Sequence, residues 1–493
     1  MEKRTKIILS AIFVITVLVR LILAFHIQEF TYQSYFNLRQ VDNILHTGLP
    51  LYHDPLSYGG RDLIFLPFFH YFMALFSLFI PLTIVAKVIP NILVATLTIT
   101  SYLIAKKITD NDTASLLAAL ITGFLPILFS TNSFTVETLS LPLTFLIIYS
   151  FFRIKEKKYL YTYIISFLIL SVTSSAALLI IIGFIIYLLL SYLESKNINR
   201  SEVEVMIFSL FFFIWVQFIF FKNALLNEGI KFIWQNIPSK IVSTYFPKVA
   251  VGQALVLVSI IPFIAGIYMV YKSLFELKGR KSFLLISFVV STTLFTWLRL
   301  LRFKSSLAFF GVILAILFAS FYQEVDKYYK KTKFPQFKRY TLPIIIILLL
   351  ISTIVPAIDA SLNQDVPSRE EVQAFQWIKE NTPENANILA TLDEGNLVTY
   401  YSDRKNIMDD QFILIDDVDI RFNDLVSLYT TQFQTQGIGL AQKYDINYIV
   451  LTPTAKEKHN IVRLNYASNH CFNLVYKNET KIYQIKCQVT ETE

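Results

Sequence analysis

Long apolar stretches alternate with short polar segments from the N-terminus to residue 358. Many of these stretches reach or approach the roughly 20 residues that a helix needs to cross a bilayer. The pattern therefore predicts a polytopic α-helical membrane protein with about eleven transmembrane helices. We expect the spans at residues 7–25, 84–105, 113–130, 138–152, 159–173, 176–193, 203–221, 250–271, 282–298, 305–322 and 341–358.

The apolar stretch at residues 63–80 is shorter and is interrupted by Pro67. If it crossed the membrane, Lys106 and Lys107 would lie on the outer side. If it lies at the membrane interface, both lysines fall on the inner side, where short loops concentrate Lys and Arg. The second arrangement agrees with the later short loops, so we predict an outer loop, 26–83, that contains an interfacial helix.

The orientation of the chain follows from its basic loops. The predicted inner loops are basic, whereas the outer loop at 222–249 is long enough to cross regardless of its scattered lysines. The first span follows a basic segment and has no small-residue cleavage site, so we expect a retained helix. These features predict a multi-pass plasma-membrane protein with a cytoplasmic N-terminus. The inner loops are 153–158, 196–200, 272–281 and 327–339.

The sequence changes character at residue 359 and stays polar to residue 493. Ser368 and Glu371 form a capping-box pattern at the start of a helix predicted for residues 368–380. Helix and strand patterns then alternate, which predicts a compact extracytoplasmic α/β domain. We therefore expect a multi-span domain at 1–358 and a soluble domain at 359–493. The expected strands include 387–390 and 448–451.

Composition agrees with the membrane class. Hydrophobic residues make up 54% of the 493 residues and charged residues 16%, and the mean hydropathy is +0.52. The net charge of +8 lies mostly in the predicted inner loops, so it does not indicate binding to nucleic acid. Two cysteines, Cys471 and Cys487, lie on the predicted outer side, where they would either pair or remain as separate thiols.

Acidic residues gather at the predicted outer ends of the spans. Glu29 and Asp54 lie in the first outer loop, and Glu137 lies between two spans. A carboxylate near the membrane surface can act as a general base or bind a metal ion. A carboxylate at membrane depth is costly unless it is paired or hydrated. The alternative for each of these residues is an ordinary solvated loop position.

A basic segment at another predicted outer end contains Arg299, Arg302 and Lys304. The planar guanidinium group of arginine presents a fork of donors that suits phosphate oxygens. The segment could therefore hold a lipid phosphate or pyrophosphate, or it could contact bulk anionic lipid. The sequence contains no P-loop, no dinucleotide-binding glycine pattern and no histidine spacing typical of a metal site.

These features, in this order, resemble the GT-C superfamily of membrane glycosyltransferases, and most closely the catalytic subunit of the archaeal-type oligosaccharyltransferase. The likeness rests on the sequence YFNLR at 35–39, on WIKENTP at 377–383 and on TLDEG at 391–395. The chain departs from the pattern at Gln33, where the family has its catalytic aspartate. It departs again at Thr391 and Leu392, where the family has two tryptophans that read the acceptor sequence.

The resemblance implies transfer of a sugar from a polyprenyl-phosphate or polyprenyl-pyrophosphate donor to a glycan, lipid or protein acceptor. It gives Glu29 the role of general base, with Asp54 as the second candidate. The resemblance implies that the basic segment binds the donor phosphate. Asp393 and Glu394 would contact the acceptor. Glu137 would orient the acceptor or, together with Glu29, bind a divalent metal such as Mg²⁺ or Mn²⁺.

Gln33 cannot accept a proton or act as a charged metal ligand. This departure favours a single-sugar transferase over a sequon-directed oligosaccharide transferase. It also leaves two alternatives open. The first is a non-catalytic paralogue that binds a lipid-linked glycan. The second is a transporter of lipid or glycan, although the middles of the predicted spans carry few of the charged groups that transporters use.

Overall fold

The computed structural model describes residues 3–245, 251–331, 338–468 and 470–488. The chain forms two compact units, each assembled from three separate segments. The helical unit consists of Met1–Gln28, Leu66–Phe220 and Ser243–Gln364. The mixed unit consists of Glu29–Phe65, Phe221–Val242 and Asp365–Glu493. Two segments from before residue 359 therefore belong to the unit that contains the C-terminal residues, while the predicted boundary at 358 remains a prediction.

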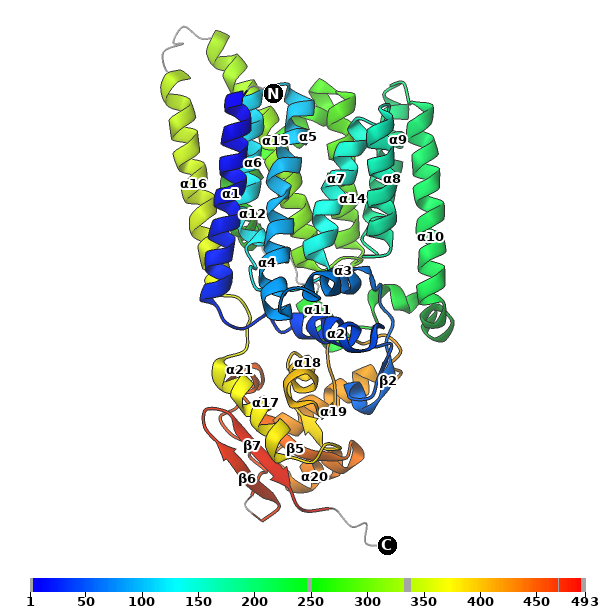
Figure 1. Cartoon of the computed structure of the whole chain (residues 1–493), viewed down its shortest axis with the longest axis vertical. Helices are drawn as coiled ribbons and strands as arrows, with labels where there is room; N and C mark the ends of the chain where they lie inside the picture. Colours follow the sequence, from blue (N-terminus) through cyan, green and yellow to red (C-terminus); the bar gives the residue numbers. More distant parts are fainter. Residues whose placement is uncertain (1–2, 246–250, 332–337, 469, 489–493) are drawn as a thin grey trace. The chain divides into compact units, whose positions relative to one another are not determined.

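The helical unit is built from helices that run back and forth in a bundle (Figure 1). Its helices are α1 (Lys3–His26), α3 (Phe68–Ser77), α4 (Leu82–Ala95), α5 (Leu97–Thr109), α6 (Asp112–Gly123), η2 (Pro126–Leu128), α7 (Glu137–Phe152), α8 (Lys157–Ser171), α9 (Ala177–Leu193), most of α10 (Arg200–Glu228), α12 (Val251–Val258), α13 (Ile260–Lys272), η5 (Ser273–Leu277), α14 (Arg280–Trp297), α15 (Phe303–Lys331) and α16 (Lys338–Leu362).

Each predicted span coincides with one or more of these helices over most of its length. Six helical stretches in the described part of the chain are long and apolar enough to cross a membrane, and several shorter apolar helices accompany them. The polytopic helical class is confirmed, whereas the count of eleven spans remains a prediction. Parts of three predicted segments lie outside the described residues, namely 246–249 of the outer loop, 250 of the span at 250–271 and 332–337 of the last inner loop.

Helix α3 (Phe68–Ser77) lies within the stretch 63–80 for which we predicted an interfacial helix, but it begins only after Pro67 and residues 63–67 are not helical. It has ten residues, which corresponds to a length of about 15 Å at 1.5 Å per residue. The hydrocarbon core of a bilayer is about 30 Å thick, so α3 is too short to cross it. Phe69 and Met73 are buried, while Leu75 and Phe79 are exposed. This arrangement agrees with the expectation that α3 does not span the membrane.

Helix α15 forms the centre of the helical unit and contacts α5, α6, α13 and α14. Its most apolar window is 72% buried, compared with 22% for α1 and 17% for α16. A helix that is apolar on all sides is stable only when it is surrounded by protein or lipid. Protein surrounds α15, whereas α1 and α16 leave large apolar side chains such as Ile22 and Val355 exposed. Those exposed faces are suited to contact with lipid.

The mixed unit contains a five-stranded sheet in the order β4-β3-β5-β7-β6. Strand β3 pairs in parallel with β4 and β5, and β7 pairs antiparallel with β5 and β6. The strands are β3 (Asn387–Leu389), β4 (Lys405–Asn406), β5 (Ile446–Leu451), β6 (Phe472–Lys477) and β7 (Lys481–Ile485), and a separate hairpin joins β1 (His53–Asp54) to β2 (Arg61–Asp62). The helices are α2 (Ser34–Thr47), η1 (Ser57–Gly59), η3 (Gly229–Trp234), η4 (Ser239–Ile241), α17 (Arg369–Asn381), α18 (Gly395–Leu397), η7 (Val398–Ser402), α19 (Val418–Thr430), α20 (Gln434–Lys443) and α21 (Pro453–His459). Helix α11 (Val242–Tyr245) begins at the last residue of the segment Phe221–Val242, and its other residues belong to the helical unit.

Two local predictions for the C-terminal part are confirmed. Helix α17 begins after Ser368, whose side chain accepts a hydrogen bond from the Glu371 backbone N–H. The Glu371 carboxylate in turn accepts a hydrogen bond from the Ser368 backbone N–H. This reciprocal capping box satisfies two backbone donors at the start of the helix. The expected strands at 387–390 and 448–451 correspond to β3 and to the second half of β5.

The segment Phe221–Val242 is held in the mixed unit by polar contacts with the C-terminal part. The Leu414 backbone N–H donates to Glu228, and the Asn236 side chain donates to the Ile415 carbonyl at 2.7 Å. The Ser239 hydroxyl donates to Asp419 at 2.7 Å. The sequence showed only a long loop here and did not predict this docking.

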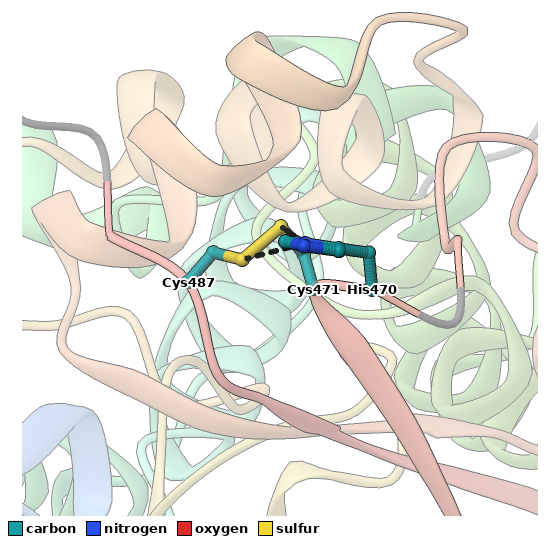
Figure 2. A group of neighbouring side chains, drawn as sticks. All are labelled: His470, Cys471 and Cys487. Atoms are coloured by element: carbon teal, nitrogen blue, oxygen red, sulfur yellow. Dashed lines mark hydrogen bonds between the residues drawn. A yellow bond between two sulfur atoms is a disulfide. The ribbon is translucent and has the colours of Figure 1, made fainter.

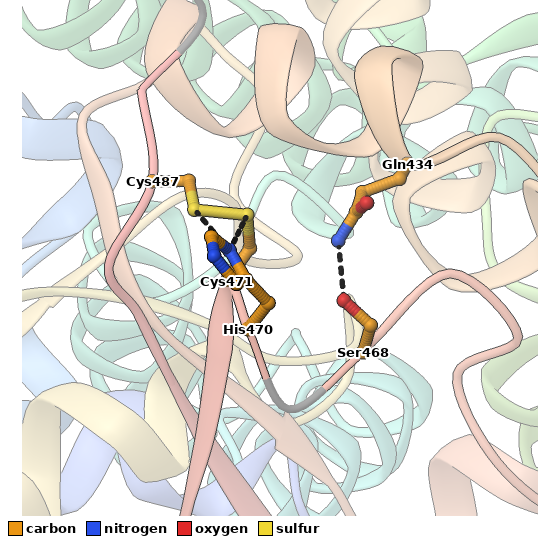
Figure 3. Close-up of a disulfide and its surroundings, with 5 residues drawn as sticks. All are labelled: Gln434, Ser468, His470, Cys471 and Cys487. Carbon is orange, nitrogen blue, oxygen red and sulfur yellow. Dashed lines mark hydrogen bonds between the residues drawn. A yellow bond between two sulfur atoms is a disulfide. The ribbon is translucent and has the colours of Figure 1, made fainter.

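A disulfide joins Cys471 and Cys487, with 4.9 Å between their Cα atoms (Figures 2 and 3). Cys471 immediately precedes β6, and Cys487 follows β7 by two residues. The bond therefore closes the open end of the β6–β7 hairpin. Of the two alternatives that the sequence left open, the structure has the paired form.

Gly395 lies where the chain has no room for a side chain. A Cβ atom there would lie 2.1 Å from the Met408 carbonyl oxygen and 2.7 Å from the Asp409 Cβ. We expect Gly395→Ala to lower the free energy of unfolding by roughly 1–3 kcal/mol or more, because overpacking forces the backbone to shift. Thermal unfolding of the purified full-length protein measures this change.

Gly439→Ala is the matched control. Gly439 lies within α20, and an added Cβ there meets no atom within 4 Å. Replacing an exposed helical glycine by alanine should stabilise the protein by about 0.5–1 kcal/mol. An equal loss of stability in both variants would contradict the packing explanation for Gly395.

Candidate functional site

In the mixed unit, Glu29 lies against a group of tyrosines. The hydroxyls of Tyr35 and Tyr401 each donate a hydrogen bond to Glu29 Oε2, both at 3.0 Å. The ring centroid of Tyr35 lies 5.4 Å from those of both Tyr400 and Tyr401. Tyr35 comes from the first turn of α2 and Tyr401 from η7, so the cluster joins residues that are 372 positions apart in the chain. We call these four residues the Glu29 cluster.

The tyrosines of the Glu29 cluster remain neutral hydrogen-bond donors. Burial, together with Tyr401 and Glu29, raises the pKa of the Tyr35 phenol well above its usual value. Burial and Glu29 raise the pKa of Tyr401 in the same direction. Hydrogen bonds from two hydroxyls to one carboxylate oxygen fix the orientation of that carboxylate. Glu29 is half-buried, so its oriented carboxylate is partly accessible.

Asp54, the second candidate base, has a different environment. Both of its oxygens bind the Arg39 guanidinium, at 2.5 and 2.9 Å. One oxygen also accepts hydrogen bonds from the backbone N–H groups of Leu56 and Ser57. Only 3% of Asp54 is exposed. A buried carboxylate with this many donors serves to hold the loop, so the geometry favours Glu29 over Asp54 as the reactive acid.

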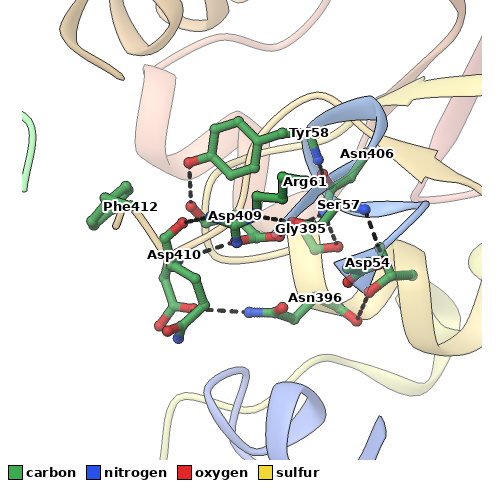
Figure 4. A network of polar contacts seen from close by, with 12 residues as sticks. Asp54, Ser57, Tyr58, Arg61, Gly395, Asn396, Asn406, Asp409, Asp410 and Phe412 are labelled. Carbon is green, nitrogen blue, oxygen red and sulfur yellow. Dashed lines mark hydrogen bonds and ion pairs between the residues drawn. The ribbon is translucent and has the colours of Figure 1, made fainter. Parts of the chain in front are cut away.

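A second buried carboxylate, Asp409, organises the same loop (Figure 4). It pairs with Arg61 at 2.9 Å and accepts hydrogen bonds from the Ser57 hydroxyl at 2.6 Å and the Asn406 side chain at 3.0 Å. The Tyr58 hydroxyl donates to the Asp409 carbonyl at 2.9 Å, and the Arg61 guanidinium lies over the Tyr58 ring. Sequence reasoning missed Asp409, because nothing in its local pattern distinguishes it from an acid in a solvated loop.

The structure places Asp393 and Glu394 in contrasting surroundings. Asp393 is partly exposed and pairs with Lys458. Glu394 has 0% exposure and accepts hydrogen bonds from the Thr391 backbone N–H and hydroxyl and from the Thr452 hydroxyl. Contact between an acceptor and Glu394 would require this side chain to be uncovered. The acceptor-binding role of both residues remains a prediction.

The departures from the family pattern also have defined positions. Gln33 is the exposed residue that precedes α2, and its side chain makes no capping hydrogen bond. Thr391 and Leu392 are 1% and 8% exposed, so they form part of the core of the mixed unit. None of the three offers an exposed aromatic surface or an acid for substrate.

In the helical unit, Glu137 lies beside the start of α15. It is the exposed first residue of α7, and the Ser305 hydroxyl donates a hydrogen bond to its Oε1 at 3.4 Å. Arg299 and Lys304 are exposed and Arg302 is half-buried, in the turn and the first helical residues that lead to Ser305. The fold therefore brings Glu137 together with the basic segment 299–304.

The same end of the helical unit holds the end of α1. The Lys87 ammonium donates to the carbonyls of Ala24 and Ile27, at 2.9 and 2.6 Å, and the Asn132 side chain also donates to the Ile27 carbonyl. Carbonyls at a helix C-terminus lack partners within the helix, so these donors satisfy them. The end of α1, the start of α4 and the loop before α7 are thereby fixed to one another.

Carboxylate oxygens such as those of Glu29 and Glu137 are the donors that Mg²⁺ and Mn²⁺ prefer. The two residues belong to different units, and their joint role as metal ligands remains a prediction. Within the described residues, a geometric cluster of potential ligands occurs at His470, Cys471 and Cys487 (Figure 2). The two sulfurs of this cluster are joined in the disulfide, so they are not thiolate ligands.

No protein-family model matches the chain, and no curated protein matches it by sequence. Solved structures do match. The oligosaccharyltransferase AglB from Archaeoglobus fulgidus, in complex with an inhibitory peptide and a dolichol-phosphate, is 14% identical, with a TM-score of 0.67 over 91% of this chain and 70% of that one. The same organism's oligosaccharyltransferase in complex with Zn and sulfate is 15% identical, with a TM-score of 0.65 over 89% and 67%.

ArnT from Cupriavidus metallidurans, bound to undecaprenyl phosphate, is 10% identical, with a TM-score of 0.58 over 96% of this chain and 97% of that one. These similarities extend over nearly the whole chain. The protein therefore has the fold of the GT-C membrane glycosyltransferases, as the sequence resemblance implied.

Glu394 makes the stability of the mixed unit depend on pH. Burial, and then the charge of Glu371, raises the pKa of the Glu394 carboxyl to about 7. The folded state therefore holds a proton on Glu394 that the unfolded state releases near pH 4.5. The contribution of this proton to the free energy of unfolding is fully present below pH 4.5 and is lost as the pH rises through about 7. We expect Glu394→Gln to remove this dependence and to stabilise the protein at pH 8 by at most about 3 kcal/mol.

The measurement is the thermal unfolding midpoint of the full-length protein between pH 4.5 and pH 8. Glu384→Gln, at an exposed position, is the control and should follow the original protein. A midpoint of Glu394→Gln that still falls with pH as steeply as that of the original protein would assign the dependence to another group.

Proposed function

We propose that the protein is a glycosyltransferase that moves a sugar from a polyprenyl-phosphate-linked donor to an acceptor at the outer membrane face. The observation that carries the proposal is the fold, shared over nearly the whole chain with two proteins whose structures contain a dolichol-phosphate and undecaprenyl phosphate. The position of Glu137 beside a basic segment supports it, because such a segment suits a phosphate.

Glu29 is the general base in this proposal. The acceptor oxygen forms a bond to the anomeric carbon of the donor sugar, and the bond from that carbon to the phosphate oxygen breaks. The acceptor hydroxyl loses its proton to Glu29, and the polyprenyl phosphate leaves with the electron pair. Tyr35 and Tyr401 are positioning residues, since their hydroxyls donate to Glu29 Oε2 and fix the orientation of the carboxylate.

Arg299, Arg302 and Lys304 bind the donor phosphate. Positive charge at this position stabilises the negative charge that develops on the leaving group. Glu137 orients the acceptor. Together with Glu29 it also provides the oxygen ligands for a divalent metal, which would neutralise phosphate charge. The archaeal structure with Zn and sulfate supports a metal in this fold.

The acceptor end of the reaction involves the mixed unit. Asp393, which is partly exposed beside Lys458, is the member of the Asp393–Glu394 pair that an acceptor can reach. Gln33, Thr391 and Leu392 lack the groups that a sequon-directed enzyme uses, and the chain aligns with 97% of ArnT. These observations support transfer of a single sugar over transfer of an oligosaccharide to a peptide.

The proposed orientation places the N-terminus in the cytoplasm and the C-terminal residues outside. The basic inner loops support it. The Cys471–Cys487 disulfide supports it independently, because disulfides persist in extracytoplasmic compartments and are rare in the cytosol.

Substitution of the base tests the chemistry. We expect Glu29→Gln to lower kcat for transfer from a polyprenyl-phosphate sugar by about 10²–10⁴-fold, as loss of a general base does. Asp42→Asn is the control, because Asp42 is exposed on α2 and pairs only weakly with His46. Full activity of Glu29→Gln would remove Glu29 from the role of base. Absence of turnover in the original protein with every donor tried would favour the non-catalytic alternative.

Substitution of the basic segment tests donor binding. We expect Arg302→Gln and Arg299→Gln each to raise KM for the lipid-linked donor by about ten-fold or more, because each removes a charged hydrogen bond to phosphate. KM for the acceptor should change little. Arg200→Gln is the control, since Arg200 is exposed at the start of α10 and pairs with Glu204. Unchanged donor KM in both variants would separate this segment from donor binding.

A further inference from the structure

The helical unit contains a cavity of about 280 Å³ where α5 and α7 end, lined by both charged and apolar groups. Three cationic side chains line it, together with two tyrosines and a leucine, and its lining includes one carboxylate. The lining residues are Tyr102, Leu103, Lys106, Lys107, Asp110, Tyr149 and Arg153.

The cavity is separate from the candidate site for sugar transfer. Helix α7 begins at Glu137 and ends at Phe152, one residue before Arg153. Its 16 residues correspond to about 24 Å along the helix axis. The cavity therefore lies at the opposite end of α7 from the contact between Glu137 and Ser305. By the charge rule this is the cytoplasmic end, because Lys106 and Lys107 mark an inner loop.

The electrostatic balance of the cavity is positive. Lys106 lies 3.4 Å from Asp110 and 3.3 Å from Asp112. The side chain of Asp110 is 98% exposed, so its charge is screened by solvent. Lys281 adds a further cation beside the cavity, where its ammonium donates to the Lys107 carbonyl. Four cations, Lys106, Lys107, Arg153 and Lys281, therefore stand beside three carboxylates, Asp110, Asp112 and Glu156, which leaves one net positive charge.

Lys107 has no hydrogen-bond or ion-pair partner for its ammonium among the residues that the structure describes. Lysines in the last turn of a helix commonly bind the terminal carbonyls and favour the negative end of the helix dipole. Lys106 does this, since its ammonium donates to the Asp110 carbonyl at 3.0 Å. The neighbouring Lys107 does not, which leaves its charge available to a ligand.

Arg153 is already oriented for a planar anion. Its guanidinium binds both oxygens of Glu156, at 2.8 and 2.7 Å, and donates to the hydroxyls of Tyr149 and Tyr159. The Glu156 side chain is 51% exposed, so solvent and soluble or lipid oxyanions reach this bidentate pair and can compete with Glu156 for the guanidinium. A phosphate diester presents the same pair of oxygens to the arginine fork.

We propose that this cavity binds the phosphate of an anionic glycerophospholipid headgroup in the cytoplasmic leaflet. Lys107 and Arg153 contact the phosphate oxygens, and Lys106 adds long-range attraction. The side chains of Leu103, Tyr102 and Tyr149 provide an apolar and hydroxyl-bearing wall for the glycerol part of the lipid. A basic pocket between membrane helices on the cytoplasmic side is a recurrent setting for such headgroups. The proposal does not depend on sugar transfer.

The test uses the full-length protein in detergent, titrated with phosphatidylglycerol or phosphatidylcholine and followed by native mass spectrometry. We expect Lys107→Gln to weaken retention of phosphatidylglycerol about five-fold, the effect of one cation near the membrane surface, and to leave phosphatidylcholine unchanged. Arg153→Gln should have a similar or larger effect. Lys107→Gln removes no side-chain hydrogen bond or ion pair among the described residues, so it keeps the test valid if Arg153→Gln folds poorly.

Lys155→Gln is the matched control. Lys155 lies in the same loop as Arg153, is exposed and does not line the cavity. Weakening by Lys107→Gln together with full retention by Lys155→Gln supports the site. Equal behaviour of the two variants, or no weakening by Lys107→Gln, overturns it.

A second arm distinguishes a lipid headgroup from a free phosphate. Inorganic phosphate is added to the complex with phosphatidylglycerol at constant ionic strength. Continued retention of the lipid assigns the site to a headgroup. Displacement of the lipid by millimolar phosphate in the original protein overturns the assignment to lipid and gives the cavity to a soluble phosphate.

Discussion

The ion pair between Arg61 and Asp409 is the interaction on which the mixed unit depends. Both side chains are buried, and Ser57, Asn406 and the Gln411 backbone complete their hydrogen bonds. Removing one partner of a buried, fully bonded pair typically costs about 3–5 kcal/mol, because the other charge is left without compensation. The pair joins residues 348 positions apart. The hydrogen bond between Tyr401 and Glu29 likewise joins the segment Glu29–Phe65 to the C-terminal segment. The segment that carries the candidate base is therefore also joined to the C-terminal part by a contact that is not itself part of the chemistry.

Features that depend on neighbouring residues were predictable from the sequence. The apolar stretches gave the positions of the long helices, and the capping box at Ser368 gave the start of α17. The basic segment 299–304 was identified because arginine and lysine are sparse at the other predicted outer ends. Helix α2 was missed, although Tyr35, Leu38, Val41 and Ile44 are all buried and recur at intervals of three residues. The polar residues of this segment favour a loop and obscure the helical spacing of its apolar positions.

Features that depend on long-range packing were not predictable. The sequence identifies Glu394 and Asp54 only as acidic residues outside the predicted spans. Their buried, hydrogen-bonded environments depend on distant or non-adjacent partners, Thr452 for Glu394 and Arg39 for Asp54. The docking of Phe221–Val242 into the mixed unit likewise rests on partners more than 170 positions away, such as Ile415. A single sequence contains no signal for such pairs. Tyr400 and Tyr401 acquire their role in the same way, because only the fold brings them to Glu29.

The division of the mixed unit into three separate segments has a consequence for biogenesis. The loop that carries Glu29 emerges after the first span, but its partners Asp409 and Tyr401 are made only after the last one. During synthesis Arg61 and Tyr35 therefore lack their partners Asp409 and Tyr401 until the remaining helices have been made. A ribosome that stalls before the C-terminal segment leaves a chain that contains the described helices of the helical unit and yet lacks a completed mixed unit.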